Sequence, residues 1–129
     1  MNQQKSLMHI KSGLLAALQQ GAISINVFNK DLLALKCIVA GTSFRQLDAI
    51  EIDLLEGVSF GLKREPANEY DKHAVALYYD QHHVGYIPRQ KNEVVARLMD
   101  AGKSFVAKVK EKDREGNWIK LKVEVYLQD

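Results

Sequence analysis

Regular alternation of apolar and polar residues near the C-terminus constrains the fold more than any other feature of the chain. On either side of the segment DREGN (113–117), every second residue is apolar, and most of the residues between are lysine or glutamate. The apolar members are Phe105, Ala107 and Val109 before the turn and Ile119, Leu121, Val123, Val125 and Leu127 after it. A period of two is typical of strands buried on one face. The region therefore predicts a long β-hairpin.

A second strand-rich region precedes this hairpin. Alternation in residues 58–63 predicts a half-buried strand, and Pro66 has to end it because proline cannot donate a ladder hydrogen bond. The segment ANEYDK (67–72) is rich in side chains that favour turns. HAVALYYD (73–80) and HVGYI (83–87) then predict a second hairpin.

Two segments have helical periodicity instead. Residues 5–20 place apolar side chains three or four positions apart, which predicts an N-terminal amphipathic helix that stops at Gly21. Residues 89–102 predict a short helix that ends at Gly102. The inward-facing residues of this second helix are expected to be Val94, Val95, Leu98 and Met99.

The remaining segments are less regular. Residues 22–34 are ambiguous between a strand and a short helix. Residues 35–44 are β-like, and Gly41 is expected to mark a bend or a close backbone approach near the end of that strand. Residues 46–56 form an acidic connection in which Ile50–Leu54 is a candidate strand.

These elements predict a mainly β fold. Six or seven short strands with one short helix between them suit a small, partly open β-barrel, which leaves few exposed strand edges. The N-terminal helix stands outside this pattern. We therefore expect a helical extension at residues 1–34 and a barrel domain at residues 35–129.

Length and composition indicate one globular domain. A chain of 129 residues can bury a core without disulfides or metals, and its 47% apolar and 26% charged residues are ordinary values. The single Cys37 lies in an apolar run, so we expect a small buried side chain and no reactive thiol. Without a signal peptide or an apolar run of membrane-spanning length, the chain is expected to be cytoplasmic and not to bind membranes.

The charge distribution restricts how nucleic acid could bind. A net charge of only +2 argues against electrostatic coating of a duplex. Residues 41–56 contain one cation, Arg45, against four acids, so one edge should repel phosphate. Any nucleic-acid site must therefore be local.

A cluster of aromatic, basic and acidic residues lies near two predicted chain reversals in residues 62–89. Its members are Arg64, Tyr70, Asp71, Lys72, His73, Tyr86 and Arg89. Aromatic faces stack on bases, cations neutralise phosphates, and a carboxylate can accept a hydrogen bond from a sugar hydroxyl. The cluster is therefore a candidate site for a short piece of nucleic acid.

The same stretch resembles the HIRAN domain, a module found in fork-remodelling helicase-like ATPases and as a small stand-alone bacterial protein. The resemblance is carried by VAGTSF (39–44), GVSFGLKREPANEYDKHAVAL (57–77), VGYIPR (84–89) and the helix that ends at Gly102. It implies an OB-like β-barrel. It also implies capture of the 3' end of single-stranded DNA, with a role in DNA repair or replication-fork processing.

The resemblance assigns roles to individual residues. It implies that Phe44 and Tyr70 stack on the terminal bases and that Asp71 accepts a hydrogen bond from the terminal 3'-hydroxyl. Tyr86 and Arg89 match positions that contact the terminal phosphates, although Tyr86 replaces a histidine found in other members. A carboxylate beside a bridging phosphodiester would meet negative charge, whereas a free hydroxyl can donate to it, so specificity for an end follows. Arg64 and Lys72 complete the expected DNA-binding set.

Each assignment has a structural alternative. Phe44 could fill the core, Tyr70 could pack on the turn, and Asp71 could cap the amide of Lys72 or His73. Arg64 could form only a surface ion pair with Glu65. Lysines of the C-terminal hairpin could form a solvated face or guide the DNA backbone. They are Lys108, Lys110, Lys120 and Lys122.

Other classes of function are less well supported. The four histidines lack metal-ligand spacing, and the chain has neither a CxxC pair nor a phosphate-binding loop, so we expect no metal, cofactor or catalytic activity. The main alternative to DNA binding is a protein-interaction or adaptor module. In that alternative the N-terminal helix would pack on the barrel, dock a partner or pair with another copy.

Overall fold

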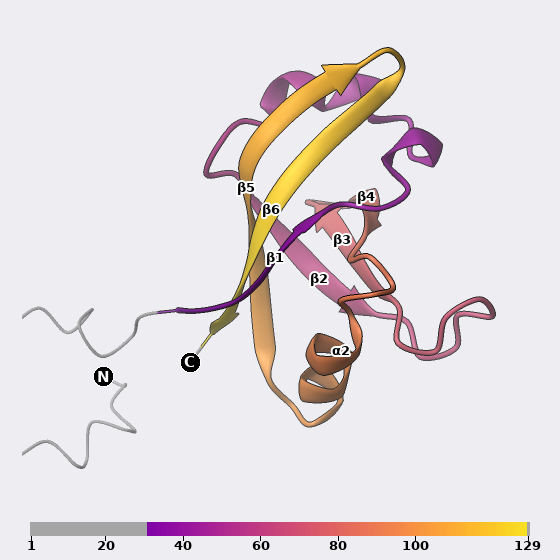
Figure 1. Ribbon diagram of the computed structural model, residues 1–129, viewed down its shortest axis with the longest axis vertical. Coiled ribbons are helices and arrows are strands. Elements are labelled where there is room, and N and C mark those ends of the chain that lie inside the picture. The colour runs from indigo at the N-terminus through magenta and orange to yellow at the C-terminus, as the bar shows by residue number, and fades with distance from the viewer. Residues whose placement is uncertain (1–30, 129) are drawn as a thin grey trace, which may run out of the picture. The chain divides into compact units, whose positions relative to one another are not determined.

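The computed structural model describes residues 31–128, which form one antiparallel sheet, one α-helix and three short 3-10 turns (Figure 1). The strands are β1 Leu32–Ile38, β2 Ser59–Arg64, β3 Val75–Tyr79, β4 His82–Tyr86, β5 Ser104–Glu115 and β6 Trp118–Gln128. Their order in the sheet is β1-β6-β5-β2-β3-β4. The predicted mainly β architecture and both predicted hairpins, β3–β4 and β5–β6, are confirmed.

The sheet curves until its two edges meet at one point. The ladder of named strands is not closed, but Ala40, just after β1, forms a bridge with Tyr86 of β4. The Ala40 amide donates to the Tyr86 carbonyl at 2.8 Å, and the Tyr86 amide donates to the Ala40 carbonyl at 2.9 Å. A Cβ atom on Gly85 would lie 2.5 Å from the Ala40 carbonyl oxygen. A glycine is therefore required where the two edges approach.

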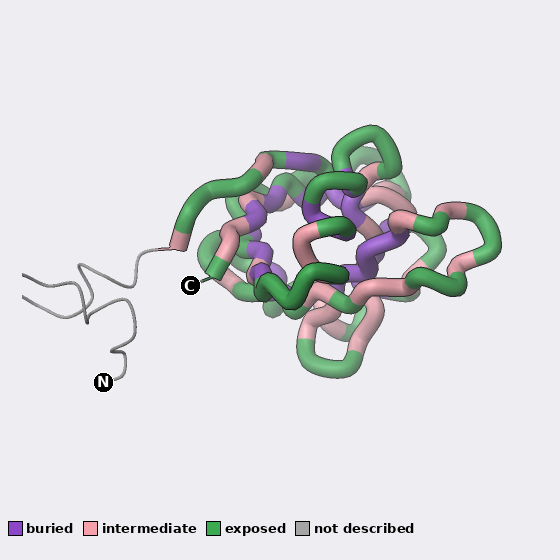
Figure 2. Tube along the Cα trace, turned by 90° about the horizontal axis from the view of Figure 1, so that it is seen from below, coloured by how far each residue is buried: buried purple, intermediate pink, exposed green. Residues whose placement is uncertain are grey.

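Buried residues line the inside of the curved sheet (Figure 2). Phe60 of β2, Leu77 of β3 and Leu121 of β6 are among the fully buried side chains, and helix α2 (Glu93–Asp100) contributes Val95 and Ala96. The alternation seen in the sequence thus corresponds to one face turned toward this core. Val94, predicted to face inward, is 67% exposed, because the helix turns the next two residues toward the sheet instead.

The connection between β1 and β2 differs from the prediction. It contains three 3-10 turns, η3 (Thr42–Phe44), η4 (Leu47–Ala49) and η5 (Glu51–Asp53), so the candidate strand at Ile50–Leu54 is wrong. Leu47 and Leu54 are buried at either end of the two later turns, Ile50 between them is partly buried, and Ile52 is 79% exposed. Two anchors seven residues apart suit successive turns better than an extended strand, which would present alternate residues to the core.

β1 begins and ends earlier than the sequence indicates. It includes residues 32–34, from the segment that was ambiguous between strand and helix, and it ends at Ile38. Gly41 then has a φ of 78°, a left-handed conformation that favours glycine, and starts η3. The expected bend at Gly41 is confirmed, and it places Phe44 in a turn instead of at the end of a strand. The predicted N-terminal helix lies outside the described residues.

Within residues 31–128, no helix is long and apolar enough to cross a membrane.

Candidate nucleic-acid interface

The loop 65–74 between β2 and β3 is shaped by the side chain of Asn68. Its Oδ1 accepts hydrogen bonds from the amides of Tyr70 and Asp71, at 2.9 and 3.1 Å, and its Nδ2 donates to Glu65 Oε1 at 3.0 Å. An asparagine side chain that bonds the amides two and three residues ahead is typical of a tight turn. This turn projects Tyr70 into solvent with 78% of its surface exposed.

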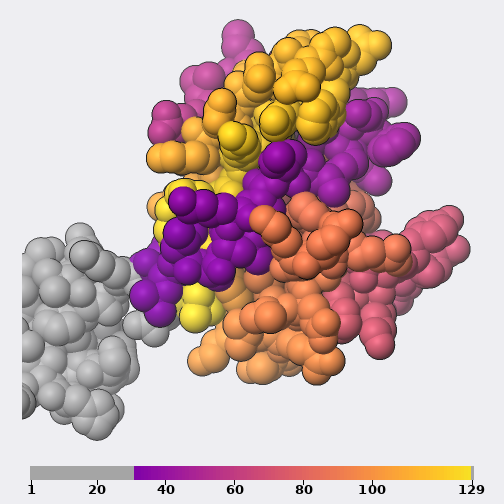
Figure 3. Space-filling view, viewed as in Figure 1, coloured from indigo at the N-terminus to yellow at the C-terminus, as the bar shows by residue number. Residues whose placement is uncertain are grey.

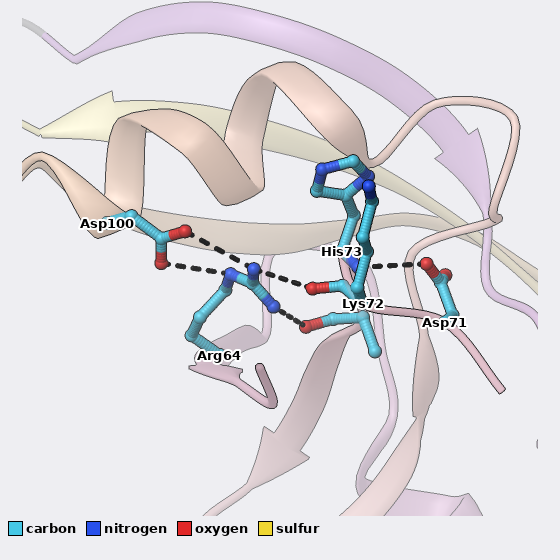
Figure 4. A network of polar contacts seen from close by, with 6 residues as sticks. Arg64, Asp71, Lys72, His73 and Asp100 are labelled. Carbon is cyan, nitrogen blue, oxygen red and sulfur yellow. Dashed lines mark hydrogen bonds and ion pairs between the residues drawn. The ribbon is translucent and has the colours of Figure 1, made fainter. Parts of the chain in front are cut away.

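Arg64 fixes the base of the same loop (Figure 4). Its guanidinium donates to the carbonyls of Ala74 and Lys72, at 3.1 and 2.7 Å, and pairs with Asp100 of α2, with Nε 3.0 Å from Oδ1. The ion pair of Arg64 is thus formed with Asp100 and not with Glu65, the partner in the structural alternative. Because its side chain is only 13% exposed and its donors face protein oxygens, Arg64 joins the loop to helix α2.

The carboxylate of Asp71 is held by two donors. The amide of His73 donates to Oδ1 at 2.9 Å, and Nδ2 of the buried Asn92 donates to Oδ2 at 2.7 Å. Burial works to raise the pKa of Asp71, but these hydrogen bonds and the nearby Arg89 outweigh it, so the pKa lies below its usual value. Asp71 is therefore an oriented anion, and its capping of the His73 amide confirms that structural alternative without using all of its lone pairs.

These side chains surround a pocket of about 470 Å³, here called the loop pocket. It is lined by Asn68, Glu69, Tyr70, Asp71, Lys72, His73, Arg89, Asn92 and Glu93. Arg89 also donates to the Tyr70 carbonyl, which ties the segment after β4 to the loop. The expected DNA-binding set has seven residues, including Phe44, and four of them, Tyr70, Asp71, Lys72 and Arg89, thus share one cavity.

Tyr86 lies beside this pocket and belongs to a second polar cluster. Its hydroxyl donates to Glu65 Oε1 at 2.9 Å, the same oxygen that Asn68 contacts. The ring centres of Tyr86 and His83 lie 4.8 Å apart in an edge-to-face arrangement, and the Arg45 guanidinium lies 5.7 Å from the centre of the Tyr86 ring. Burial and the bond to Glu65 raise the pKa of Tyr86. A phosphate at Tyr86 would have to displace Glu65 from its hydroxyl.

Phe44 lies on η3, outside the set that lines the loop pocket, and is 80% exposed. That exposure contradicts the alternative in which Phe44 fills the core, and the exposure of Tyr70 likewise contradicts packing on the turn. Both rings are therefore accessible from solvent. Stacking on bases stays a prediction for both.

Sequence reasoning did not find Asn92. The residue directly precedes helix α2, so its type suggested nothing beyond a helix cap. The structure shows no capping hydrogen bond from its side chain, which reaches Asp71 instead. The signal available in the sequence was the polar run 89–93 at the start of the predicted helix, and only the folded chain brings it to the loop.

Three lysines of the C-terminal hairpin lie in loose ion pairs, as a solvated face would require. The distances are 3.8 Å for Lys110 to Glu56, 3.9 Å for Lys120 to Glu115 and 3.4 Å for Lys122 to Glu111. Lys108 lies 5.5 Å from the ring centre of Tyr126. In the part of the chain that the structure describes, no group of three or more histidine, cysteine or acidic residues could hold a metal ion.

Comparisons with known proteins agree with this architecture. A crystal structure of a protein from Lactobacillus plantarum matches with a TM-score of 0.69 and 27% identity, over 78% of this chain and 99% of that one. The HIRAN domain of human HLTF matches with a TM-score of 0.60 and 17% identity, over 78% of this chain and 81% of that one. Among curated proteins, no match is found.

The family comparison covers the whole described fold. The model of the HIRAN domain matches residues 33–128, from β1 through β6, and so includes every residue of the loop pocket. The chain therefore belongs to the HIRAN domain family.

Proposed function

We propose that the chain binds the 3' end of single-stranded DNA in the loop pocket and acts in DNA repair or replication-fork processing. HIRAN domains are known as nucleic-acid-binding modules, which supports the general class of ligand. The observation that carries the proposal is the Asp71 carboxylate, held by His73 and Asn92 in a cavity that also contains an exposed tyrosine and an arginine.

The pocket chemistry favours a free hydroxyl over a phosphate. Each oxygen of Asp71 accepts one hydrogen bond from the protein and retains a lone pair for a second donor. A terminal 3'-hydroxyl can supply that donor, whereas a phosphate at the same place would bring a second negative charge. Lys72 and Arg89 lie in the same lining and can neutralise the phosphate on the 5' side of the terminal nucleotide.

Removal of the carboxylate tests the end preference. We expect wild-type protein to bind a short single-stranded oligonucleotide with a 3'-hydroxyl more tightly than one with a 3'-phosphate, and Asp71→Ala to lose that preference in fluorescence anisotropy. Glu69→Ala is the matched control, because Glu69 is an exposed acid in the same lining. Equal binding of both ends by wild type would show that the pocket does not read 3' ends.

Removal of the ring tests stacking. Tyr70→Ala should weaken single-strand binding by ~1 to 3 kcal/mol, the usual contribution of one base stacked on an aromatic ring. Folding stability should be little changed because the side chain is exposed. Tyr70→Phe, which keeps the ring, should bind nearly as wild type does. An unchanged DNA affinity in Tyr70→Ala would favour the adaptor alternative instead.

A further inference from the structure

A second cavity, also of about 470 Å³, lies beside β1 and is here called the lysine groove. Lys36 and Ile38 of β1, Lys110 of β5 and Lys122 of β6 contribute to its lining, together with Pro88 and Lys91 from the segment before α2. Cys37 lies in its floor, where burial raises the pKa of the thiol to about 11, so this side chain is neutral. The groove thus combines an apolar floor with four cationic side chains and one acidic side chain, Glu124.

Three of the four cations of the groove, Lys36, Lys110 and Lys122, form only loose ion pairs. Lys122 lies 3.4 Å from Glu111, and Lys110 and Lys36 each lie 3.8 Å from their glutamates, Glu56 and Glu124. The side chains of these three lysines are 48–70% exposed. Exposed ion pairs contribute little free energy, so the ammonium groups can exchange a carboxylate for a phosphate at small cost.

One turn of chain separates the lysine groove from the loop pocket. The amide of Lys91 donates to the Pro88 carbonyl at 2.9 Å, which closes a turn over residues 88–91. Pro88 and Lys91 line the groove, whereas Arg89 and Asn92 line the loop pocket. Figure 3 shows this orange segment on one face of the molecule, between the indigo β1 and the magenta loop 65–74. A ligand longer than the loop pocket can therefore continue into the groove.

We propose that the lysine groove is a second subsite for single-stranded DNA, which binds the phosphates of nucleotides on the 5' side of the end held in the loop pocket. The inference rests on the proposed function of that pocket. Phosphates complement the four lysines, and sugars and base edges can contact Ile38 and Pro88. An acidic peptide would match the charge but would not explain why the groove lies only one turn of chain from the loop pocket.

The test compares a trinucleotide with an oligonucleotide of about twelve residues, both with a free 3'-hydroxyl, over a series of salt concentrations. The variant is Lys36→Gln/Lys122→Gln, since both side chains are exposed and neither lines the loop pocket. The matched control is Lys63→Gln/Lys103→Gln, two lysines outside both cavities. Lys91 is left intact because its ammonium group also donates to the Lys36 carbonyl at 2.9 Å.

We expect wild type to bind the longer oligonucleotide more tightly than the trinucleotide and the variant to lose most of that gain. Loss of two phosphate contacts should reduce the slope of log K against log salt by about 1.4 for the longer oligonucleotide. Trinucleotide affinity and the preference for a 3'-hydroxyl should stay as in wild type, and the control should behave as wild type throughout.

The possible outcomes separate the two proposals. If wild type prefers a 3'-hydroxyl but the length gain and salt slope are unchanged in the variant, the loop pocket stands and the groove proposal is overturned. If the trinucleotide does not bind but the longer oligonucleotide does, with the slope lost in the variant, the groove stands alone. If neither oligonucleotide binds, both proposals fail. A glutamate decamer is the probe for acidic peptides. If it competes in a way that depends on Lys36 and Lys122, and DNA shows no gain in affinity with length, the groove binds acidic peptides and the proposal of a DNA subsite is overturned.

Discussion

The long hairpin β5–β6 and the unit formed by loop 65–74, β3 and β4 are held in place by different means. β5 and β6 have 12 and 11 residues, pair along their whole length with one register shift after Val109, and bury alternate side chains in residues 105–109 and 119–125. β3 and β4 have five residues each, with a register irregularity after Leu77. The loop before them depends on the polar contacts of two side chains, Arg64 and Asn68.

The difference shows where sensitivity to single changes should lie. In the hairpin, stability is spread over many apolar contacts, and substitution of one exposed residue should alter little. In the loop unit, one side chain often satisfies two or three partners, so its removal leaves several groups unpaired. The proposed site is built on the second kind of region, and its geometry should respond to changes that do not touch DNA.

The largest expected effect is at Gly85, where the two edges of the sheet meet. In Gly85→Ala the new Cβ would clash with the Ala40 carbonyl and with Val39, and relief requires backbone movement, so we expect a loss of about 3 kcal/mol in the free energy of unfolding. Urea denaturation measures it. Gly61→Ala is the matched control, because a Cβ on that strand glycine would meet nothing within 4 Å. Equal stability of the two variants would show that the bridge at Ala40 does not constrain the fold.

Arg64→Ala tests the base of the loop. It removes hydrogen bonds to two carbonyls and the ion pair with Asp100, and we expect a loss of about 2 kcal/mol in unfolding free energy. Arg97→Ala, which removes an exposed pair with Glu93 on the same helix, should cost about 0.5 kcal/mol or less. If Arg64→Ala cost as little as the control, the loop would not depend on the contacts of Arg64. The DNA affinity of Arg64→Ala should also fall, because Arg64 holds the backbone of Lys72, which lines the loop pocket.

The same division explains which parts of the fold the sequence could predict. The hairpin β5–β6 follows from period two because burial is its main determinant, and helix α2 follows from its apolar spacing. The candidate strand at Ile50–Leu54 is wrong because the apolar residues of this connection fit short turns as well as a strand. Val94 faces solvent although its type suggested the core. Apolar pattern alone does not determine rotation of a short helix.

The arrangement of the loop pocket could be predicted only in part, for a related reason. The motif from Arg64 to Lys72 contains three of the predicted residues that line the pocket, and Arg89 is the fourth. The pairing of Arg64 with Asp100 and of Asn92 with Asp71, however, joins residues 36 and 21 positions apart. Such contacts depend on how α2 packs beside the loop. No local periodicity encodes them.

Asn92→Ala should produce a smaller and more selective effect. Without the Asn92 donor, the Asp71 carboxylate loses one of its two fixed contacts, and we expect the preference for a 3'-hydroxyl over a 3'-phosphate to fall by about 1 kcal/mol. Affinity for the 3'-phosphate should change less, because the stacking and cationic groups remain. A purely structural role would weaken binding to both ends equally, which separates the two explanations in one titration.

The smallest expected effect concerns pH and the cluster around His83. Its Nδ1 lies 3.1 Å from the Arg45 guanidinium and its Nε2 lies 3.0 Å from the Gly85 carbonyl, so the neutral ring donates through Nε2 and accepts from Arg45. Burial and then Arg45 lower the pKa of His83, whereas the hydrogen bond to the Gly85 carbonyl and then Glu65 oppose them. A proton on Nδ1 would face the arginine cation, with Tyr78 and Tyr86 packed against the ring.

Because the folded protein disfavours protonated His83, the unfolded chain binds the proton more readily below its ordinary pKa of about 6.5. Stability should therefore be complete above that pH and decline as the pH falls below it. The lowered pKa of Asp71 and Glu65 acts in a more acidic window, near pH 4, so unfolding measured between pH 7 and 5.5 isolates the histidine. His83→Gln should flatten this slope, and His73→Gln should retain it. If the pH dependence of stability survives in His83→Gln, another titratable group of the protein is responsible for it.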